Sequence, residues 1–329
     1  MNHDDIERIR RMPGSSLLLF ITDRCPVNCA HCSVDSRSDG PVISDYDLFD
    51  ALLTGICQQE KIEVVGISGG EPFAERRGLT LACSKFNECG KSIVIYTSGV
   101  WAKASKPPGW ITDVLKKCST IYLSTDSFHQ AGVPVQHFTH AACQIADAGA
   151  HIVVQTLDVK QASDILHKAF KTDFTSFAEI VPIVPLQNGR GKQIFNFRPA
   201  TPAASVGSCA LAITPVVRYD GIVTSCCNEE IIMGHGPQRF RSKARSSDDL
   251  DEILVRYKHD PLMRCVAGVG LGQLLIHPRL DSLNKQKYVS TCQLCWEIMK
   301  KFPALPPTDR LIHAIAELGE ADEHHIHST

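Results

Sequence analysis

The sequence lacks any run of apolar residues long enough to span a membrane. It also lacks an apolar signal segment near its beginning, where residues 1–12 are polar and carry charges of both signs. Its formal net charge is only −2, so nothing in the composition indicates binding to nucleic acid or to an anionic membrane surface. These absences predict a cytoplasmic protein that has neither nucleic acid nor a membrane as a partner.

Cysteine, by contrast, is abundant, because the 329 residues include 14 cysteines. A disulfide framework is typical of small secreted domains and does not suit a long chain without a signal segment. In a reducing compartment, clustered cysteines more often bind metal or carry out redox chemistry. We expect most of the cysteines outside close-spaced motifs to be small buried apolar side chains. These are Cys57, Cys83, Cys89, Cys118, Cys143, Cys227 and Cys265.

From residue 17 to about residue 186, strand-like segments alternate with helix-like segments. The expected strands are residues 17–22, 63–68, 92–97, 120–124, 151–157 and 177–185, and they are apolar on both faces. The expected helices are residues 45–58, 77–89, 108–118, 135–148 and 161–171. Six such units predict an α/β fold with a parallel sheet, either open or curled into a partial barrel.

The pattern changes after residue 186. Residues 197–206 are expected to form an irregular connection. Residues 208–300 hold six of the 14 cysteines and a predicted hairpin with its turn at Asp220-Gly221. An amphipathic helix is expected over residues 307–319 and a disordered tail over residues 320–329. The predicted division is therefore residues 1–190 for the barrel, 191–300 for a cysteine-rich extension, and 301–329 for a helix and tail.

Three thiols lie within eight residues, at Cys25, Cys29 and Cys32, directly after the first expected strand. Three cysteines are one ligand short of a closed tetrahedral zinc or iron–sulfur site. An iron–sulfur cluster held by three thiolates leaves one iron free to bind another molecule. The alternative is a zinc knuckle that lacks its fourth ligand.

This motif resembles the signature of the radical SAM superfamily. The resemblance implies a partial (β/α)6 barrel in which the three cysteines hold a 4Fe–4S cluster. It also implies that the open iron binds S-adenosylmethionine (SAM), whose reductive cleavage gives a 5′-deoxyadenosyl radical that abstracts a substrate hydrogen. His31 stands where the superfamily places an aromatic residue beside the adenine.

Other segments resemble further motifs of the superfamily. Gly69-Gly70-Glu71 resembles the turn whose backbone and carboxylate hold the SAM amino group. Ser124 and Asp126 resemble a Ser-x-Asp motif facing SAM or substrate, although a helix N-cap is an equal alternative for Asp126. Arg190 resembles a residue that contacts SAM or a substrate carboxylate, and its alternative is a solvated loop arginine.

The second cysteine group resembles the SPASM and Twitch extensions of radical SAM enzymes, which carry auxiliary 4Fe–4S clusters. Cys209, Cys226, Cys292 and Cys295 would complete one four-thiolate site, as in the shorter Twitch type, because the extension has too few cysteines for the two clusters of a full SPASM domain. Cys227 could replace Cys226 as a ligand. Cys265 could bind a second, partial cluster or belong to the core. A structural zinc site is the alternative for the whole group.

Many relatives with such extensions modify ribosomally made peptides by crosslinking or epimerisation, so a peptide-modifying enzyme is our first hypothesis. The barrel begins by residue 17, so a partner protein or the barrel mouth would recognise the peptide. Epimerisation needs a hydrogen donor, for which Cys227 and Cys265 are candidates. An external donor of the flavodoxin or ferredoxin type would supply electrons. A dehydrogenase or cyclase acting on a sugar or nucleotide is the second hypothesis, and a non-catalytic iron–sulfur or zinc scaffold or redox sensor is the third.

Overall fold

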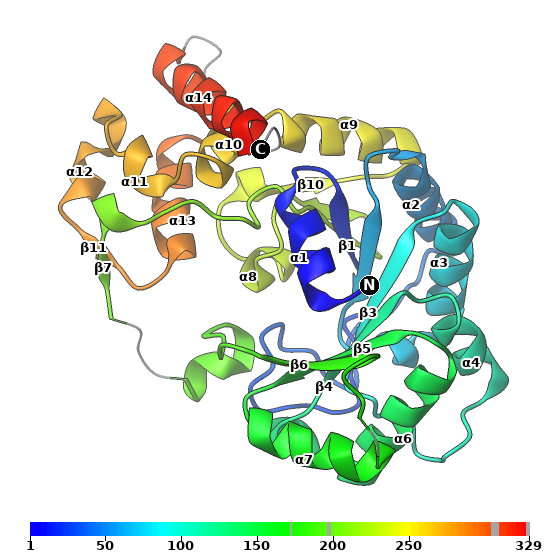
Figure 1. The fold of residues 1–329 in the computed structure, drawn as a ribbon. Coiled ribbons are helices and arrows are strands. Elements are labelled where there is room, and N and C mark those ends of the chain that lie inside the picture. The colour runs from blue at the N-terminus through cyan, green and yellow to red at the C-terminus, as the bar shows by residue number, and fades with distance from the viewer. Residues whose placement is uncertain (172, 196–198, 304–308, 327–329) are drawn as a thin grey trace.

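The computed structural model describes residues 1–171, 173–195, 199–303 and 309–326, with side chains described as far as residue 318. The predicted alternation of strands and helices is confirmed (Figure 1). Its elements are β1 (Ser16–Phe20), α2 (Tyr46–Gln58), β2 (Val64–Ser68), α3 (Arg76–Glu88), β3 (Ser92–Thr97), α4 (Gly109–Leu115), β4 (Thr120–Ser124), α6 (Val135–Asp147), β5 (His151–Thr156), α7 (Val159–Phe170) and β6 (Ala178–Pro182).

Strands β1 to β6 form a parallel sheet in chain order, curled so that the helices cover its outer face (Figure 1). Leu19, Ile67, Ile95, Leu123 and Val154 point outward from successive strands into the core shared with these helices. Because the six strands are parallel, their carboxyl ends all lie at one edge of the sheet, where barrels of this kind have their active sites.

The sheet continues into the extension, which the sequence did not indicate. Strand β8 (Val216–Arg218) pairs in parallel with β1, and it forms an antiparallel hairpin with β9 (Ile222–Thr224), which pairs with β10 (Arg241–Lys243). The hairpin predicted at Asp220-Gly221 is confirmed: Gly221 has φ +85°, a conformation that favours glycine. Helix α9 (Ser247–Lys258) packs on α2, so part of the segment 191–300 completes the barrel core.

Helix α1 (His3–Arg11) lies on the concave side of the sheet, opposite the covering helices (Figure 1). The side chain of Asn2 accepts a hydrogen bond from the Asp5 amide in a capping box. Ile6 and Ile9 are buried in a cluster that also contains Val64, Val94, Tyr122 and Val153 from the inner face of the sheet. The sequence analysis did not predict this helix.

The rest of the extension forms a second apolar core, which the C-terminal helix α14 (Arg310–Ile326) joins. Its own helices include α8 (Glu229–Ile232), α10 (Pro261–Ala267), α11 (Leu271–Leu274), α12 (Asp281–Asn284) and α13 (Thr291–Lys301). Strands β7 (Thr201–Pro202) and β11 (Lys287–Tyr288) pair beside this core, so the segment expected to be irregular contains a short strand, while residues 196–198 lie outside the described chain. The predicted last helix is present as α14. It extends to Ile326, so the expectation of a disordered tail is wrong as far as that residue; residues 327–329 lie outside the described chain. Within the described residues, no helix combines the length and apolarity needed to cross a bilayer.

Candidate active site

The loop after β1 presents Cys25, Cys29 and Cys32 to a single cavity of about 620 Å³ at the carboxyl ends of the strands. No other cysteine of the described chain lines this cavity. Burial raises the pKa of the Cys25 thiol to about 11 and that of Cys29 to about 12, and the neighbouring thiols Cys25 and Cys32 add to the shift at Cys29. The predicted triple-cysteine motif is therefore brought together around open space.

The turn after β2 lies directly against the start of the cysteine loop. The amide of Gly70 donates to the Thr22 carbonyl at 2.6 Å, and the amide of Glu71 donates to the Arg24 carbonyl at 2.8 Å. A Cβ atom at Gly70 would overlap the Arg24 carbonyl, so only glycine allows this approach. Gly69 and Gly70 also line the cavity, as expected.

Glu71 also lines the cavity, and its carboxylate is held by the protein. It accepts hydrogen bonds from the Thr97 hydroxyl at 2.7 Å, from the Ser98 hydroxyl at 2.6 Å and from the Ser98 amide at 3.0 Å. It also accepts one from the Phe73 amide at 3.3 Å. Burial raises the pKa of Glu71, and these hydrogen bonds act in the opposite direction. The side chain ties the glycine turn to the end of β3, and its contact with a SAM amino group stays a prediction.

Ser124, His31 and His129 line the cavity, whereas Asp126 does not. Asp126 caps helix α5 (Ser127–Gln130): it accepts hydrogen bonds from the Phe128 amide at 2.8 Å and the His129 amide at 2.9 Å. Its other oxygen lies 2.9 Å from His129 Nδ1 and 3.6 Å from His31 Nε2. The N-cap alternative for Asp126 is thus the observed one.

His31 stacks on Phe128, with ring centroids 4.8 Å apart. Its Nδ1 atom is buried and has no hydrogen-bond partner within the described chain, so a polar ligand in the cavity could satisfy it. The sequence analysis missed His129 as a cavity residue. Its position directly after the Ser-x-Asp motif was the available signal.

Arg190 lines the same cavity, but its guanidinium is engaged by the cysteine loop. Nε and Nη2 donate to the Cys29 carbonyl at 2.9 and 2.7 Å, and Nη1 donates to Asp35 at 2.7 Å and to the Ser36 carbonyl at 3.0 Å. Arg190 therefore holds the cysteine loop in place. Its direct contact to SAM or to a substrate carboxylate stays a prediction.

The second cysteine group also comes together. Cys209, Cys226 and Cys292 line a cavity of about 740 Å³, and Cys295 lies behind them in the core of the extension. Burial raises the pKa of Cys226, and the charges of Cys227, Cys295 and Cys209 raise it further. Asn228 donates to the Cys292 sulfur at 3.4 Å. The arrangement offers four thiols, as a closed metal or cluster site requires.

The two candidate hydrogen donors differ. Cys227 lines both the 740 Å³ cavity and a third cavity of about 240 Å³ inside the barrel. Burial raises the pKa of Cys227 to about 11, while nearby Arg10 acts in the opposite direction. Cys265 is fully buried in the core of the extension, and its thiol donates to the Ile312 carbonyl at 3.4 Å. Cys265 therefore lies in the core, which favours the core alternative, while its donor and ligand roles stay predictions.

Comparisons with known proteins agree with this geometry. Residues 12–131, which contain the first three cysteines but none of the second group, match a family described as a 4Fe-4S single cluster domain. The structure of Streptococcus suis SuiB bound to S-adenosylmethionine is similar, with a TM-score of 0.53 and 12% identity, covering 88% of this chain and 80% of SuiB. The structure of anSMEcpe with bound AdoMet and Cp18Cys peptide has a TM-score of 0.51 and 13% identity, covering 92% of this chain and 99% of anSMEcpe. The chain has the radical SAM fold. A search of curated proteins finds no sequence match.

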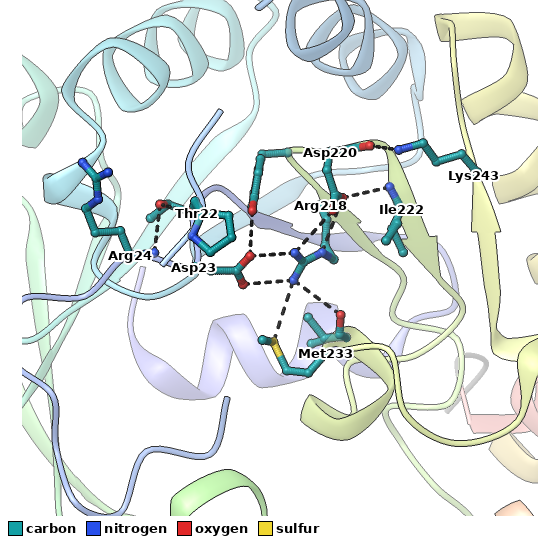
Figure 2. A network of polar contacts seen from close by, with 11 residues as sticks. Thr22, Asp23, Arg24, Arg218, Asp220, Ile222, Met233 and Lys243 are labelled. Carbon is teal, nitrogen blue, oxygen red and sulfur yellow. Dashed lines mark hydrogen bonds and ion pairs between the residues drawn. The ribbon is translucent and has the colours of Figure 1, made fainter. Parts of the chain in front are cut away.

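In this radical SAM fold, a buried ion pair joins the start of the cysteine loop to the extension (Figure 2). Arg218 at the end of β8 makes two contacts with the Asp23 carboxylate, at 2.8 and 3.2 Å, and a further contact with Asp220 at 3.4 Å. The Tyr219 hydroxyl donates to the same Asp23 oxygen at 2.7 Å. Because Asp23 lies two residues before Cys25, this network fixes the first cysteine site relative to the strands of the extension.

Proposed function

We propose that the protein is a radical SAM enzyme in which Cys25, Cys29 and Cys32 hold a 4Fe–4S cluster whose open iron binds SAM. The observation that carries the proposal is that the three thiols share one cavity with the Gly69–Gly70 turn and the end of β4. When bound, the cluster and SAM would supply a 5′-deoxyadenosyl radical that abstracts a hydrogen atom from the substrate.

The residues around the cavity suit this chemistry. The backbone of Gly69 and Gly70 offers polar groups without side chains, and His31 and His129 add ring nitrogens to the lining. Val184 and Leu186, from the segment after β6, line the same cavity and are exposed, at 65% and 39%. A substrate that covered this apolar surface would exclude water there and hold its C–H bond near the reacting carbon.

We further propose that Cys209, Cys226, Cys292 and Cys295 hold one auxiliary 4Fe–4S cluster. Three partly buried thiols that line the second cavity and the buried thiol of Cys295 behind them support this assignment, and a zinc ion is the competing occupant. The auxiliary cluster would carry an electron to or from the substrate or bind it. A flavodoxin or ferredoxin in the cytoplasm would reduce the first cluster.

A ribosomally made peptide is the substrate we propose first. Two observations support this choice. The structure of anSMEcpe, which has a similar fold, contains a bound peptide. The two cysteine cavities share the lining residues Leu186 and Glu229, which suits an extended ligand. A radical SAM dehydrogenase or cyclase acting on a small molecule is the alternative. A scaffold or redox sensor would bind iron without cleaving SAM, so SAM cleavage separates it from both enzymes.

The test is an anaerobic count of iron and sulfide on reconstituted protein, paired with 5′-deoxyadenosine formation from SAM under reduction. We expect about eight irons in the wild type and about four in a triple variant with Cys25, Cys29 and Cys32 changed to Ala, which would form no 5′-deoxyadenosine. The matched control changes three cysteines outside both sites, Cys57, Cys89 and Cys143, to Ala and should behave as the wild type.

Each other result has a definite meaning. About four irons together with one zinc in the wild type would mean that the second site holds a structural zinc ion and no auxiliary cluster. Intact clusters without any SAM cleavage would reject the enzyme proposal. Equal loss of iron in both triple variants would reject Cys25, Cys29 and Cys32 as specific ligands.

A further inference from the structure

Glu229, the first residue of helix α8, lies where the three interior cavities meet. It lines the cavity of the first cysteine group, the cavity of the second group and the smaller cavity inside the barrel. No other residue of the described chain lines all three of these cavities. A ligand that reaches from one cysteine site toward the other would pass this carboxylate.

The arginine and lysine side chains along these cavity walls already have carboxylate partners. The three pairs are Arg10–Glu7 at 2.5 Å, Arg190–Asp35 at 2.7 Å and Lys192–Glu230 at 2.8 Å. These pairs leave no Arg or Lys of the described cavity walls for Glu229.

Glu229 itself has no cation within 4.0 Å among the residues that the structure describes. Its one side-chain partner there is Asn188, whose amide donates to Oε2 at 2.9 Å. Burial raises the pKa of Glu229, and the neighbouring charge of Glu230 adds to this shift. Glu71 also lacks a cation, but it accepts four hydrogen bonds from groups of the protein, so its charge is compensated.

We propose that Glu229 binds a positively charged nitrogen of the substrate, so that the substrate is an amine- or guanidinium-bearing molecule. A half-buried carboxylate whose donors are neutral, the Asn188 amide group and its own backbone amide, keeps an uncompensated charge, and a cation brought by a ligand would supply the opposite charge. Asn188 fixes the orientation of the carboxylate before the ligand arrives. The inference rests on the proposed function, because it names the substrate class of that same site.

The test measures binding to reconstituted protein in the presence of SAM, by calorimetry under anaerobic conditions. The first probe pair is an acetylated pentapeptide amide, Gly-Ala-Lys-Ala-Gly, and the same peptide with norleucine in place of lysine. The second pair is glucosamine, at a pH that keeps its amine protonated, and glucose. The peptide pair and the sugar pair distinguish a peptide source of the cation from a small-molecule source.

The variants are Glu229→Gln and, as a matched control, Glu230→Gln. Gln keeps an acceptor for Asn188 and removes only the charge, so Glu229→Gln is expected to fold. Glu230 carries the same charge one residue later but is already paired with Lys192. We expect at least one cationic probe to bind the wild type about tenfold or more tightly than its neutral counterpart, a preference that Glu229→Gln abolishes and Glu230→Gln retains.

Equal binding of the charged and neutral probes, no measurable binding of either cationic probe, or an unchanged preference in Glu229→Gln would overturn the inference. SAM cleavage is measured on the same preparations as a separate readout. Cleavage without a preference for the cation would reject the role of Glu229 and keep the proposed function. A cation preference that depends on Glu229, found without SAM cleavage, would keep the role of Glu229 in binding and reject the proposed function.

Discussion

Replacing Arg218 by Met should destabilise the protein strongly, because it removes one partner of a buried ion pair (Figure 2). The Arg218 side chain is 7% exposed and that of Asp23 is 10% exposed. In the variant, the Asp23 carboxylate keeps the Tyr219 hydroxyl but loses both contacts with the guanidinium. The guanidinium carbon also lies 5.0 Å from the centroid of the Phe20 ring, so the variant loses this cation–π contact together with the ion pair.

The expected loss is about 3–5 kcal/mol in the free energy of unfolding, as found when a buried pair loses one member. Lys300→Met is the matched control, because it removes the cation of an exposed pair with Glu297, in which Lys300 is 57% exposed. Its expected cost is at most about 1 kcal/mol. Arg218→Lys should fall between the two, since lysine keeps the charge but cannot make both contacts with Asp23.

The measurement is chemical unfolding of the metal-free protein under reducing conditions, followed by far-UV circular dichroism. An Arg218→Met variant within about 1 kcal/mol of the wild type would refute the reasoning, since it would mean that Asp23 is solvated or compensated without Arg218. A loss of the same size in Lys300→Met would also refute it. In that case, removal of any surface cation would explain the effect.

Two further predictions concern single side chains. If Cys227 donates a hydrogen atom to the substrate radical, Cys227→Ala will keep its iron but will no longer incorporate solvent deuterium into the product, as measured by mass spectrometry. The control variant Cys265→Ala, changed in the core, will incorporate deuterium normally. Normal incorporation in Cys227→Ala would contradict the donor role. Glu71→Gln should lower the free energy of unfolding by about 1–3 kcal/mol, because the Gln amide group would face the donors Thr97 and Ser98. Unfolding of the metal-free protein measures this loss, and unchanged stability would mean that Glu71 is protonated and already donates a hydrogen bond there.

The alternation of strands and helices was predictable because each strand is apolar on both faces. Val64, Val65 and Ile67 show this in β2: one side of the strand packs against the outer helices and the other against α1. Such a run is readable without knowing its partners. Helix α1 was not, because most of its nine residues are polar or charged, and its two buried isoleucines become informative only once the concave face of the sheet exists to receive them.

The short strands of the extension could not be predicted from local sequence patterns. Strands β8 and β9 have three residues each, too few for a periodic signal, and only the Asp-Gly turn between them was readable. That β8 pairs with β1 follows from long-range contacts such as Arg218 with Asp23, which the sequence does not encode locally. The protein partners of Glu71 and Arg190 could not be predicted for the same reason: a motif indicates the type of side chain, while its hydrogen-bond partners come from other elements.

The connection between the two cysteine sites shows what these long-range contacts accomplish. The loop after β6 holds the first site at one side, where the Arg190 guanidinium and amide donate to the carbonyls of Cys29 and Cys32. Two residues on, Lys192 pairs with Glu230 in α8, the helix that follows Cys226 and Cys227. Because one short segment contacts both the first cysteine loop and α8, the position of the second cysteine group depends on that of the first.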